Sequence, residues 1–284
     1  MSNFKLGVLS ASFRCGFEDT LKKVKALGLD GIQLDVVSGE NDFRTFDSDR
    51  LKVFNGLMDK YSLQVSALCG DLGGHGIMER EENKTKIPDM MKIIDLANTL
   101  NVNVVTTHIG TVPSDPNEER YDIMCNAART LGTYAKERNV TLAIETGPET
   151  PETLKSFIED AACGGLGVNL DPANLAMVTD VEAPHAVRVL GKHIVHTHAK
   201  DGIMLKKTEP RIIYDFFAYG GIEDLRLGEY FLETPLGRGS VLWDEYIKAL
   251  NDVGFDGYLT IERECGEDPE ADIKLAVDFL KKKI

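Results

Sequence analysis

Residues 141–171 read TLAIETGPETPETLKSFIEDAACGGLGVNLD. A short apolar run at Thr141–Thr146 is followed by a turn, an amphipathic stretch at Pro151–Ala162 and a second apolar run at Gly167–Asp171. Apolar residues spaced three and four apart indicate a helix, and short runs rich in branched apolar residues indicate buried strands. The segment therefore predicts one unit of β-strand, α-helix and β-strand.

The same alternation continues in both directions along the chain, and the repeat predicts an α/β fold. Eight such units favour a closed (β/α)8 TIM barrel over an open sheet. The other expected strands are Lys5–Ser10, Gly31–Val36, Gln64–Cys69, Asn103–His108, Ile194–Ala199 and Tyr258–Arg263. The other expected helices are Leu21–Leu27, Leu51–Tyr61, Ile87–Leu100, Tyr121–Arg138, Trp243–Val253 and Glu270–Lys283.

An open, doubly wound sheet is the alternative fold. The loop after the first strand reads SASFRCG at Ser10–Gly16, and it lacks the glycine fingerprint of a dinucleotide-binding sheet. A barrel of about 250 residues accounts for most of the 284 residues, so we expect a single domain over residues 1–284.

One connection is longer than the others. The distance along the chain from Ile194 to Tyr258 exceeds one loop and one helix, so residues 201–241 are expected to form an elaborated loop. Long loops of this fold cover the active face and are usually functional. A surface excursion or a contact between subunits is the alternative.

Composition narrows the possible partners. Hydrophobic residues make up 43% and charged residues 27%, as in ordinary globular proteins. The net charge of −14 disfavours nucleic acid and anionic membranes as partners. No apolar run approaches the roughly 18 residues of a membrane span, and the five cysteines contain no C-x-x-C pair. These features predict a cytoplasmic protein.

Polar residues end four consecutive expected strands, in an order that indicates a metal site. They are Glu145, Asp171, His198 and Glu262. The carboxyl ends of barrel strands converge on one mouth. Oxygen ligands with one imidazole suit Mn²⁺, Mg²⁺, Co²⁺ or Zn²⁺. Any one carboxylate could instead cap the next helix, but four polar groups in one mouth cost desolvation free energy unless a ligand binds them.

These stretches resemble the xylose isomerase-like TIM-barrel superfamily, in particular its sugar and sugar-phosphate isomerase and epimerase branch, which is related to AP endonuclease family 2. The matching stretches are LAIE at 142–145, NLDPAN at 169–174, HTHAKD at 196–201, GRG at 237–239 with Trp243, and GYLTIE at 257–262. Their order and spacing carry the resemblance, which covers nearly the whole chain.

The resemblance implies that Glu145, Asp171, His198 and Glu262 hold a divalent metal ion. His198 is preferred to His196 because it precedes the Lys-Asp pair, and Glu262 is preferred to its rival Glu264. Glu145 and Glu262 are also the expected acid and base. They would move protons while the metal ion stabilises an enediolate of the substrate.

Further residues are expected to contact the substrate, with solvated or packed positions as the alternative for each. They are His108, Asn174, Lys200, Arg238 and His196. Gln33 or Asp35, at the end of the second strand, is expected to shape the pocket. The chain has Asn174 and Met204 where ketose 3-epimerases of the superfamily usually have histidine and arginine, and its His-x-Lys-Asp stretch is closer to inosose dehydratase-type members.

The expected function is therefore a metal-dependent isomerase or epimerase of a sugar or sugar phosphate. A metal-dependent keto-polyol (inosose-type) dehydratase is the alternative. An endonuclease IV-like phosphodiesterase and a non-catalytic sugar-binding barrel are less favoured, because the first needs more histidines and the second would not need intact ligands. The expected partner is a small-molecule sugar or sugar phosphate, and the resemblance implies a homo-oligomer, either a dimer or a tetramer.

Overall fold

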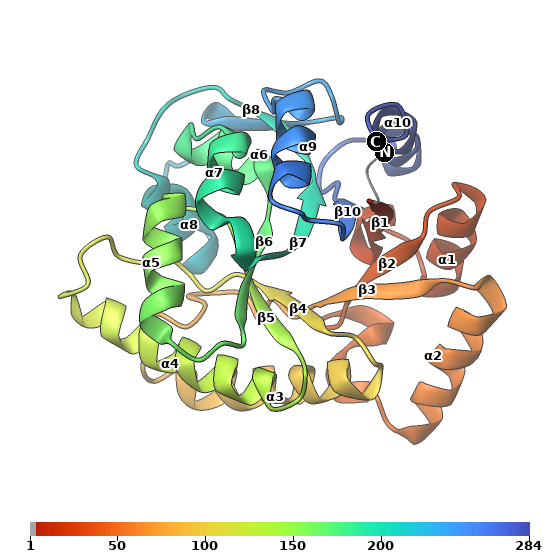
Figure 1. Cartoon of the computed structure of the whole chain (residues 1–284), viewed down its shortest axis with the longest axis horizontal. Coiled ribbons are helices and arrows are strands. Elements are labelled where there is room, and N and C mark those ends of the chain that lie inside the picture. The colour runs from red at the N-terminus through yellow and green to blue at the C-terminus, as the bar shows by residue number, and fades with distance from the viewer. Residues whose placement is uncertain (1–3) are drawn as a thin grey trace.

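The computed structural model describes residues 4–284, and eight parallel strands close into a barrel in the order β1-β10-β7-β6-β5-β4-β3-β2. Figure 1 shows the strands surrounded by helices. The barrel strands are β1 Lys5–Leu9, β2 Gly31–Asp35, β3 Gln64–Cys69, β4 Val104–Thr107, β5 Thr141–Glu145, β6 Leu166–Leu170, β7 Ile194–Ala199 and β10 Tyr258–Ile261. The predicted (β/α)8 barrel is confirmed.

Seven of the long helices occupy the positions that the amphipathic stretches predict, apart from their ends, and the sequence analysis did not predict the helix at Ala183–Leu190. The long helices are α1 Phe17–Ala26, α2 Ser48–Tyr61, α3 Asn83–Thr99, α4 Glu119–Lys136, α5 Pro151–Ala161, α7 Ala183–Leu190, α9 Trp243–Asp252 and α10 Pro269–Leu280. Their apolar faces pack against the outside of the strands in one large core. Between β6 and α7 lie the short α6 Pro172–Asn174 and a π turn, η4 Leu175–Thr179.

Residues 201–241, where the sequence analysis expects an elaborated loop, contain secondary structure of their own. They form β8 Asp201–Met204, α8 Pro210–Ala218 and β9 Phe231–Thr234, and β8 pairs antiparallel with β9. Only Lys200 separates β8 from β7, so the extended backbone continues past the barrel. A second apolar cluster, which includes Ile213 of α8 and Met177 of η4, holds this insertion against the barrel.

The inside of the barrel contains both small apolar and polar side chains. Ala67 and Ala143 belong to a small cluster of their own. Buried polar side chains of other strands line the same interior: Gln33, Thr106, Asn169, His196 and Thr260. Buried polar groups must find hydrogen-bond partners, so this polar interior can support a charged site at one end of the barrel.

Among the described residues, none of the helices combines the length and the apolar character that crossing a membrane requires.

Candidate metal centre

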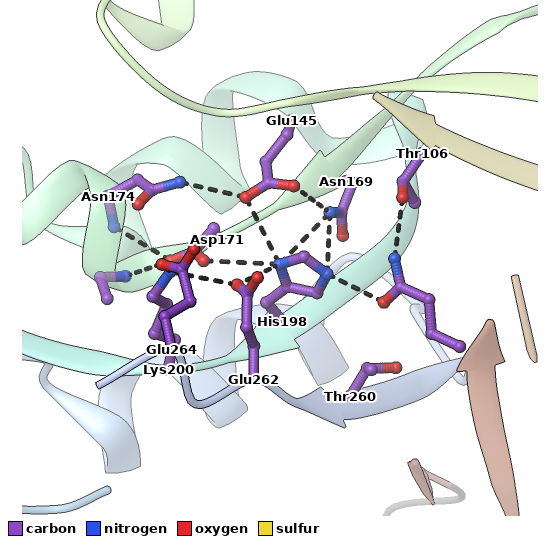
Figure 2. A network of polar contacts seen from close by, with 12 residues as sticks. Thr106, Glu145, Asn169, Asp171, Asn174, His198, Lys200, Thr260, Glu262 and Glu264 are labelled. Atoms are coloured by element: carbon purple, nitrogen blue, oxygen red, sulfur yellow. Dashed lines mark hydrogen bonds and ion pairs between the residues drawn. The ribbon is translucent and has the colours of Figure 1, made fainter. Parts of the chain in front are cut away.

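The four polar residues at the strand ends converge. Glu145 ends β5, Asp171 follows β6, His198 lies near the end of β7 and Glu262 follows β10. One ligand atom from each lies within 4.8 Å of those of the others. Figure 2 shows the four side chains turned toward one another. Glu262 belongs to this group and its rival Glu264 does not. Parallel strands in register bring these side chains together although they are far apart in the sequence.

His198 presents one ring nitrogen to the centre and is held by the other. Its Nδ1 lies 3.0 Å from Glu262 Oε2 and 3.4 Å from both Glu145 Oε1 and Asp171 Oδ2. Its Nε2 donates to Gln33 Oε1 at 2.9 Å. Gln33 Nε2 in turn donates to Thr106 Oγ1 at 2.8 Å. A metal-binding histidine is commonly oriented in this way, with its second N–H held by an oxygen atom.

Asp171 provides the test of whether a cation fits. Its Oδ1 accepts hydrogen bonds from the backbone N–H groups of Ala173 and Asn174, so it caps α6. Its Oδ2 is buried without a hydrogen-bond partner. A buried carboxylate oxygen left without a partner is costly. Because this oxygen faces the other three ligand atoms, a divalent cation fits the centre.

Asn174 and His108 lie on either side of Glu145. Asn174 Nδ2 donates to Glu145 Oε1 at 3.1 Å. His108 Nε2 lies 3.6 Å from the same oxygen, and His108 Nδ1 lies 2.9 Å from Asp71 Oδ2. Asn169 Nδ2 donates to Glu145 Oε2 at 3.0 Å. Glu145 is therefore held by side chains from β6, from α6 and from the residue that follows β4, and His108 lies beside it as a substrate contact would.

Lys200 is buried against Glu262. Its Nζ lies 3.3 Å from Glu262 Oε2 and in direct contact with Glu264 Oε2. Only 5% of the Lys200 side chain is exposed, while that of Glu264 is 63% exposed. Lys200 thus offsets the charge of the ligand set, and its role as a substrate contact stays a prediction.

The other expected contacts lie farther from the ligands. His196 is buried below His198, where its Nε2 lies 3.0 Å from Thr260 Oγ1 and 3.3 Å from Gln33 Oε1. Arg238 is exposed, in a turn whose Gly237 packs on Phe279 of α10. His196 therefore supports the polar interior, and no contact of the described residues draws Arg238 into the centre.

The two residues at the end of β2 have different surroundings. Gln33 holds His198, as described above. Asp35 accepts hydrogen bonds from the backbone of Val37 and from Ser38 Oγ, so it stabilises the turn after the strand. The expectation for Gln33 thus becomes a specific one: it orients a metal ligand.

The charges of the centre shift the pKa values of its own groups. Burial raises the pKa of Glu262, but Lys200 and His198 outweigh burial and hold it at about 2. Burial lowers the pKa of His198, but the carboxylates of Glu262 and Glu145 raise it well above its usual value. Partial burial lowers the pKa of His108, but Glu145 and Asp71 raise it to about 10. Each carboxylate is thus stabilised in its charged form, which is the form that binds metal ions.

Asp71 and Asn169 are parts of the centre that the sequence analysis did not single out as site residues. Asp71 lies two residues after β3, so a search for carboxylates just beyond strand ends would have found it. Asn169 lies in β6 two residues before Asp171, and both residues are fully buried. The neutral amide of Asn169 gave no signal of its own.

The chain belongs to the xylose isomerase-like TIM barrel family, whose model matches residues 21–283.

Three solved structures share its fold. The xylose isomerase domain protein from Planctomyces limnophilus is 23% identical, with a TM-score of 0.80, over 98% of this chain and 96% of that one. The probable 3-DHS dehydratase AsbF from Bacillus anthracis is 20% identical, with a TM-score of 0.75, over 98% and 99% of the two chains. D-Psicose 3-epimerase from Clostridium cellulolyticum H10, bound to D-tagatose, is 14% identical, with a TM-score of 0.72, over 99% of both.

Proposed function

We propose that the protein is a divalent-metal-dependent isomerase or epimerase of a sugar-like ketone. The convergence of Glu145, Asp171, His198 and Glu262 at the carboxyl end of the barrel carries this proposal. The epimerase among the structural neighbours supports it. The metal ion would be Mn²⁺, Mg²⁺, Co²⁺ or Zn²⁺, and we keep a cytoplasmic location and a homo-oligomer as further expectations.

All four residues would bind the metal ion, and two of them would also transfer protons. A divalent ion held there supplies electrostatic stabilisation of the negative charge that develops on the substrate oxygens. Asp171 and His198 hold the ion only, because the capping contacts of Asp171 and the hydrogen bond of His198 to Gln33 fix both side chains. Glu145 and Glu262 come from different strands and are the candidates for moving protons.

The two glutamates would remove a proton from the substrate and return one to it. One carboxylate takes the proton from the carbon next to the carbonyl group, and the electron pair of that C–H bond forms the enediolate. Return of a proton to the former carbonyl carbon, while the hydroxyl proton passes to the former carbonyl oxygen, gives an isomer. Return from the other carboxylate to the opposite face of the same carbon gives an epimer. Lys200 and His108 each lie beside one of the carboxylates and hold it in place.

Exchange of the substrate proton with deuterated solvent tests this function. Protein freed of metal should lose exchange and regain it with Mg²⁺ or Mn²⁺. Glu262→Gln should still bind the ion, with lower affinity, but should no longer exchange the proton. Glu264→Gln is the matched control, because Glu264 lies two residues farther along and outside the ligand set. Full exchange by the demetallated protein, or by Glu262→Gln, would contradict the proposal.

A keto-polyol dehydratase is the second candidate. Asn174 and Met204, which replace residues usual in ketose 3-epimerases, favour it, and the probable dehydratase among the structural neighbours supports it. The same proton abstraction would then be followed by departure of a β-hydroxyl group as water. Appearance of an unsaturated or dicarbonyl product, detected by NMR, would select this reaction over isomerisation.

A further inference from the structure

Helix α8 of the insertion delivers a tyrosine to the mouth of the barrel. Tyr214 lies over the loop that follows Glu145, because a Cβ atom on Gly147 would come 2.5 Å from the Tyr214 hydroxyl oxygen. The ring of Tyr214 is 6.2 Å from that of His108. Since His108 contacts Glu145, the phenol lies beside the metal ligands. Tyr214 itself is partly buried at this position.

Glu149 lies in the same loop and is buried without a role in the metal centre. Only 7% of Glu149 is exposed to solvent, and its Oε2 has no hydrogen-bond partner. Burial raises the pKa of Glu149 to about 8. Tyr214 lies against Gly147, two residues before Glu149, and burial and then Glu149 raise the pKa of its phenol. A buried acid with one unpartnered oxygen and a phenol over the same loop are suited to bind ligand hydroxyl groups.

Three cations near this mouth, His108, Lys200 and Lys86, are paired with carboxylates or carbonyl groups. His108 is paired with Asp71, and Lys200 with Glu262 and Glu264. Lys86 contacts Glu82 and two backbone carbonyl groups of the loop after β3. Phosphate groups are bound by free guanidinium or ammonium groups and by unpaired backbone N–H groups.

The backbone amides after β7 are also occupied. TIM barrels frequently bind phosphate with the loops after the seventh and eighth strands. Here the buried Asp201 carboxylate accepts hydrogen bonds from the backbone N–H groups of Gly202, Gly237 and Val241, and from Trp243 Nε1. An acidic side chain thus fills the place that a phosphate group would need.

From these contacts we infer that the substrate is an uncharged polyhydroxy ketone rather than a sugar phosphate, and that Glu149 and Tyr214 bind its hydroxyl groups away from the reacting carbonyl. The inference rests on the proposed function and names its substrate class. Glu149 and Tyr214 are specificity-determining residues of the same site.

Two measurements on the Mg²⁺-loaded protein test the inference. The probes are D-fructose, D-allulose and D-tagatose, each with its 6-phosphate. Solvent deuterium exchange measures turnover, and saturation-transfer NMR measures binding independently of turnover. We expect the free ketoses to be turned over with a kcat/KM roughly tenfold or more above that of the phosphates, because the cations beside the centre, His108 and Lys200, are already paired with carboxylates.

Variants separate the two contacts from a general change in charge. Glu149→Leu and Tyr214→Phe should raise KM for the free ketose roughly 3- to 10-fold, with kcat little changed. Glu149→Gln should restore most of the affinity lost in Glu149→Leu, because an amide keeps a donor and an acceptor. Glu152→Gln and Tyr230→Phe are the matched controls and should leave KM unchanged. Glu152 faces His185, and Tyr230 packs in the insertion.

The outcomes distinguish failure of the inference from failure of the function. Exchange that favours the phosphates would overturn the inference and leave the proposed function standing, as would a KM unaffected by Glu149→Leu and Tyr214→Phe. Absence of exchange with every probe, together with binding of free ketoses that these two variants weaken, would reject the reaction and support the substrate class. Absence of both exchange and binding would overturn the inference as well.

Discussion

At the scale of single residues, the histidine of the candidate metal centre is held by a neutral glutamine that lies far from it in the sequence. Gln33 lies on β2, yet it holds the Nε2 of His198 on β7 at 2.9 Å. When the imidazole of His198 is neutral and its proton is on Nε2, the lone pair of Nδ1 is available to a metal ion in the centre. Gln33 thereby selects both the tautomer and the ring orientation of His198.

Replacement of Gln33 should weaken metal binding without removing a ligand. Gln33→Leu should lower the affinity for Mn²⁺ roughly 10- to 100-fold, because the ring of His198 loses the acceptor that orients it. Isothermal titration calorimetry measures the affinity. Gln64→Leu, an exposed position at the start of β3, is the control. Equal affinities in the two variants would show that Gln33 does not orient His198.

At the scale of elements, the insertion after β7 is anchored by one buried carboxylate. Asp201 begins β8 and accepts four hydrogen bonds: one from its neighbour Gly202, two from the turn before α9, and one from Trp243, the first residue of α9. Residues 201–241, which the sequence analysis treats as one long loop, are therefore held against the barrel at both ends. The insertion can hold Tyr214 in place because its own ends are held.

Loss of this anchor should destabilise the fold and leave the ligand set present. Asp201→Ala removes an acceptor shared by four buried donors, and hydrogen bonds to charged groups contribute about 1.5–3 kcal/mol each. We expect the free energy of unfolding to fall by about 3 kcal/mol or more, measured by urea denaturation. Asp215→Ala, which removes an exposed pair with Arg211 on α8, should cost less than about 0.5 kcal/mol. A cost for Asp201→Ala as small as that of the control would contradict the anchoring role.

Removal of α8 should separate substrate binding from metal binding. Replacement of residues 209–222 by a short Gly-Ser linker removes Tyr214 and leaves β8 and β9 in the chain. KM for the ketose should rise, while the affinity for Mn²⁺ should stay within about threefold, because none of the four ligands lies in the segment. Calorimetry with Mn²⁺ and deuterium exchange measure the two quantities. Loss of metal binding with retained folding would show that the insertion also supports the ligands.

At the scale of the whole molecule, three of the 46 acidic residues are gathered at one end of the barrel. Their mutual repulsion is offset by His198 and Lys200, and a divalent cation would offset it further. The metal ion should therefore stabilise the folded chain, because the unfolded chain does not hold the four ligands together.

Thermal unfolding measures this coupling. Mn²⁺ at a hundredfold excess over its dissociation constant should raise the free energy of unfolding by about 2.7 kcal/mol, with a corresponding rise in Tm. Asp171→Asn should remove most of this rise, because it takes away the unpaired Oδ2 while an amide oxygen can still cap α6. A Tm that Mn²⁺ raises equally in the parent protein and in Asp171→Asn would show that the ion binds elsewhere.

The order of strands and helices could be predicted because local patterns carry it. The run Ile194–Ala199 forms β7 with the predicted ends, and the predicted Gln64–Cys69 forms β3. The ends of other elements shift by a few residues, as at β10, which stops at Ile261 although the apolar run suggests Arg263. Glu262 then lies just past the strand, where its side chain is free to turn into the mouth.

The sequence by itself determined the barrel and the identity of the four clustered acidic and imidazole residues, because strand periodicity and the residue at each strand end are local properties. Only the tertiary structure decided which groups support them. Gln33, Asp71, Glu149 and Tyr214 act across strands and through an insertion. Contacts between residues far apart along the chain are made by packing and barrel closure, which no local pattern contains.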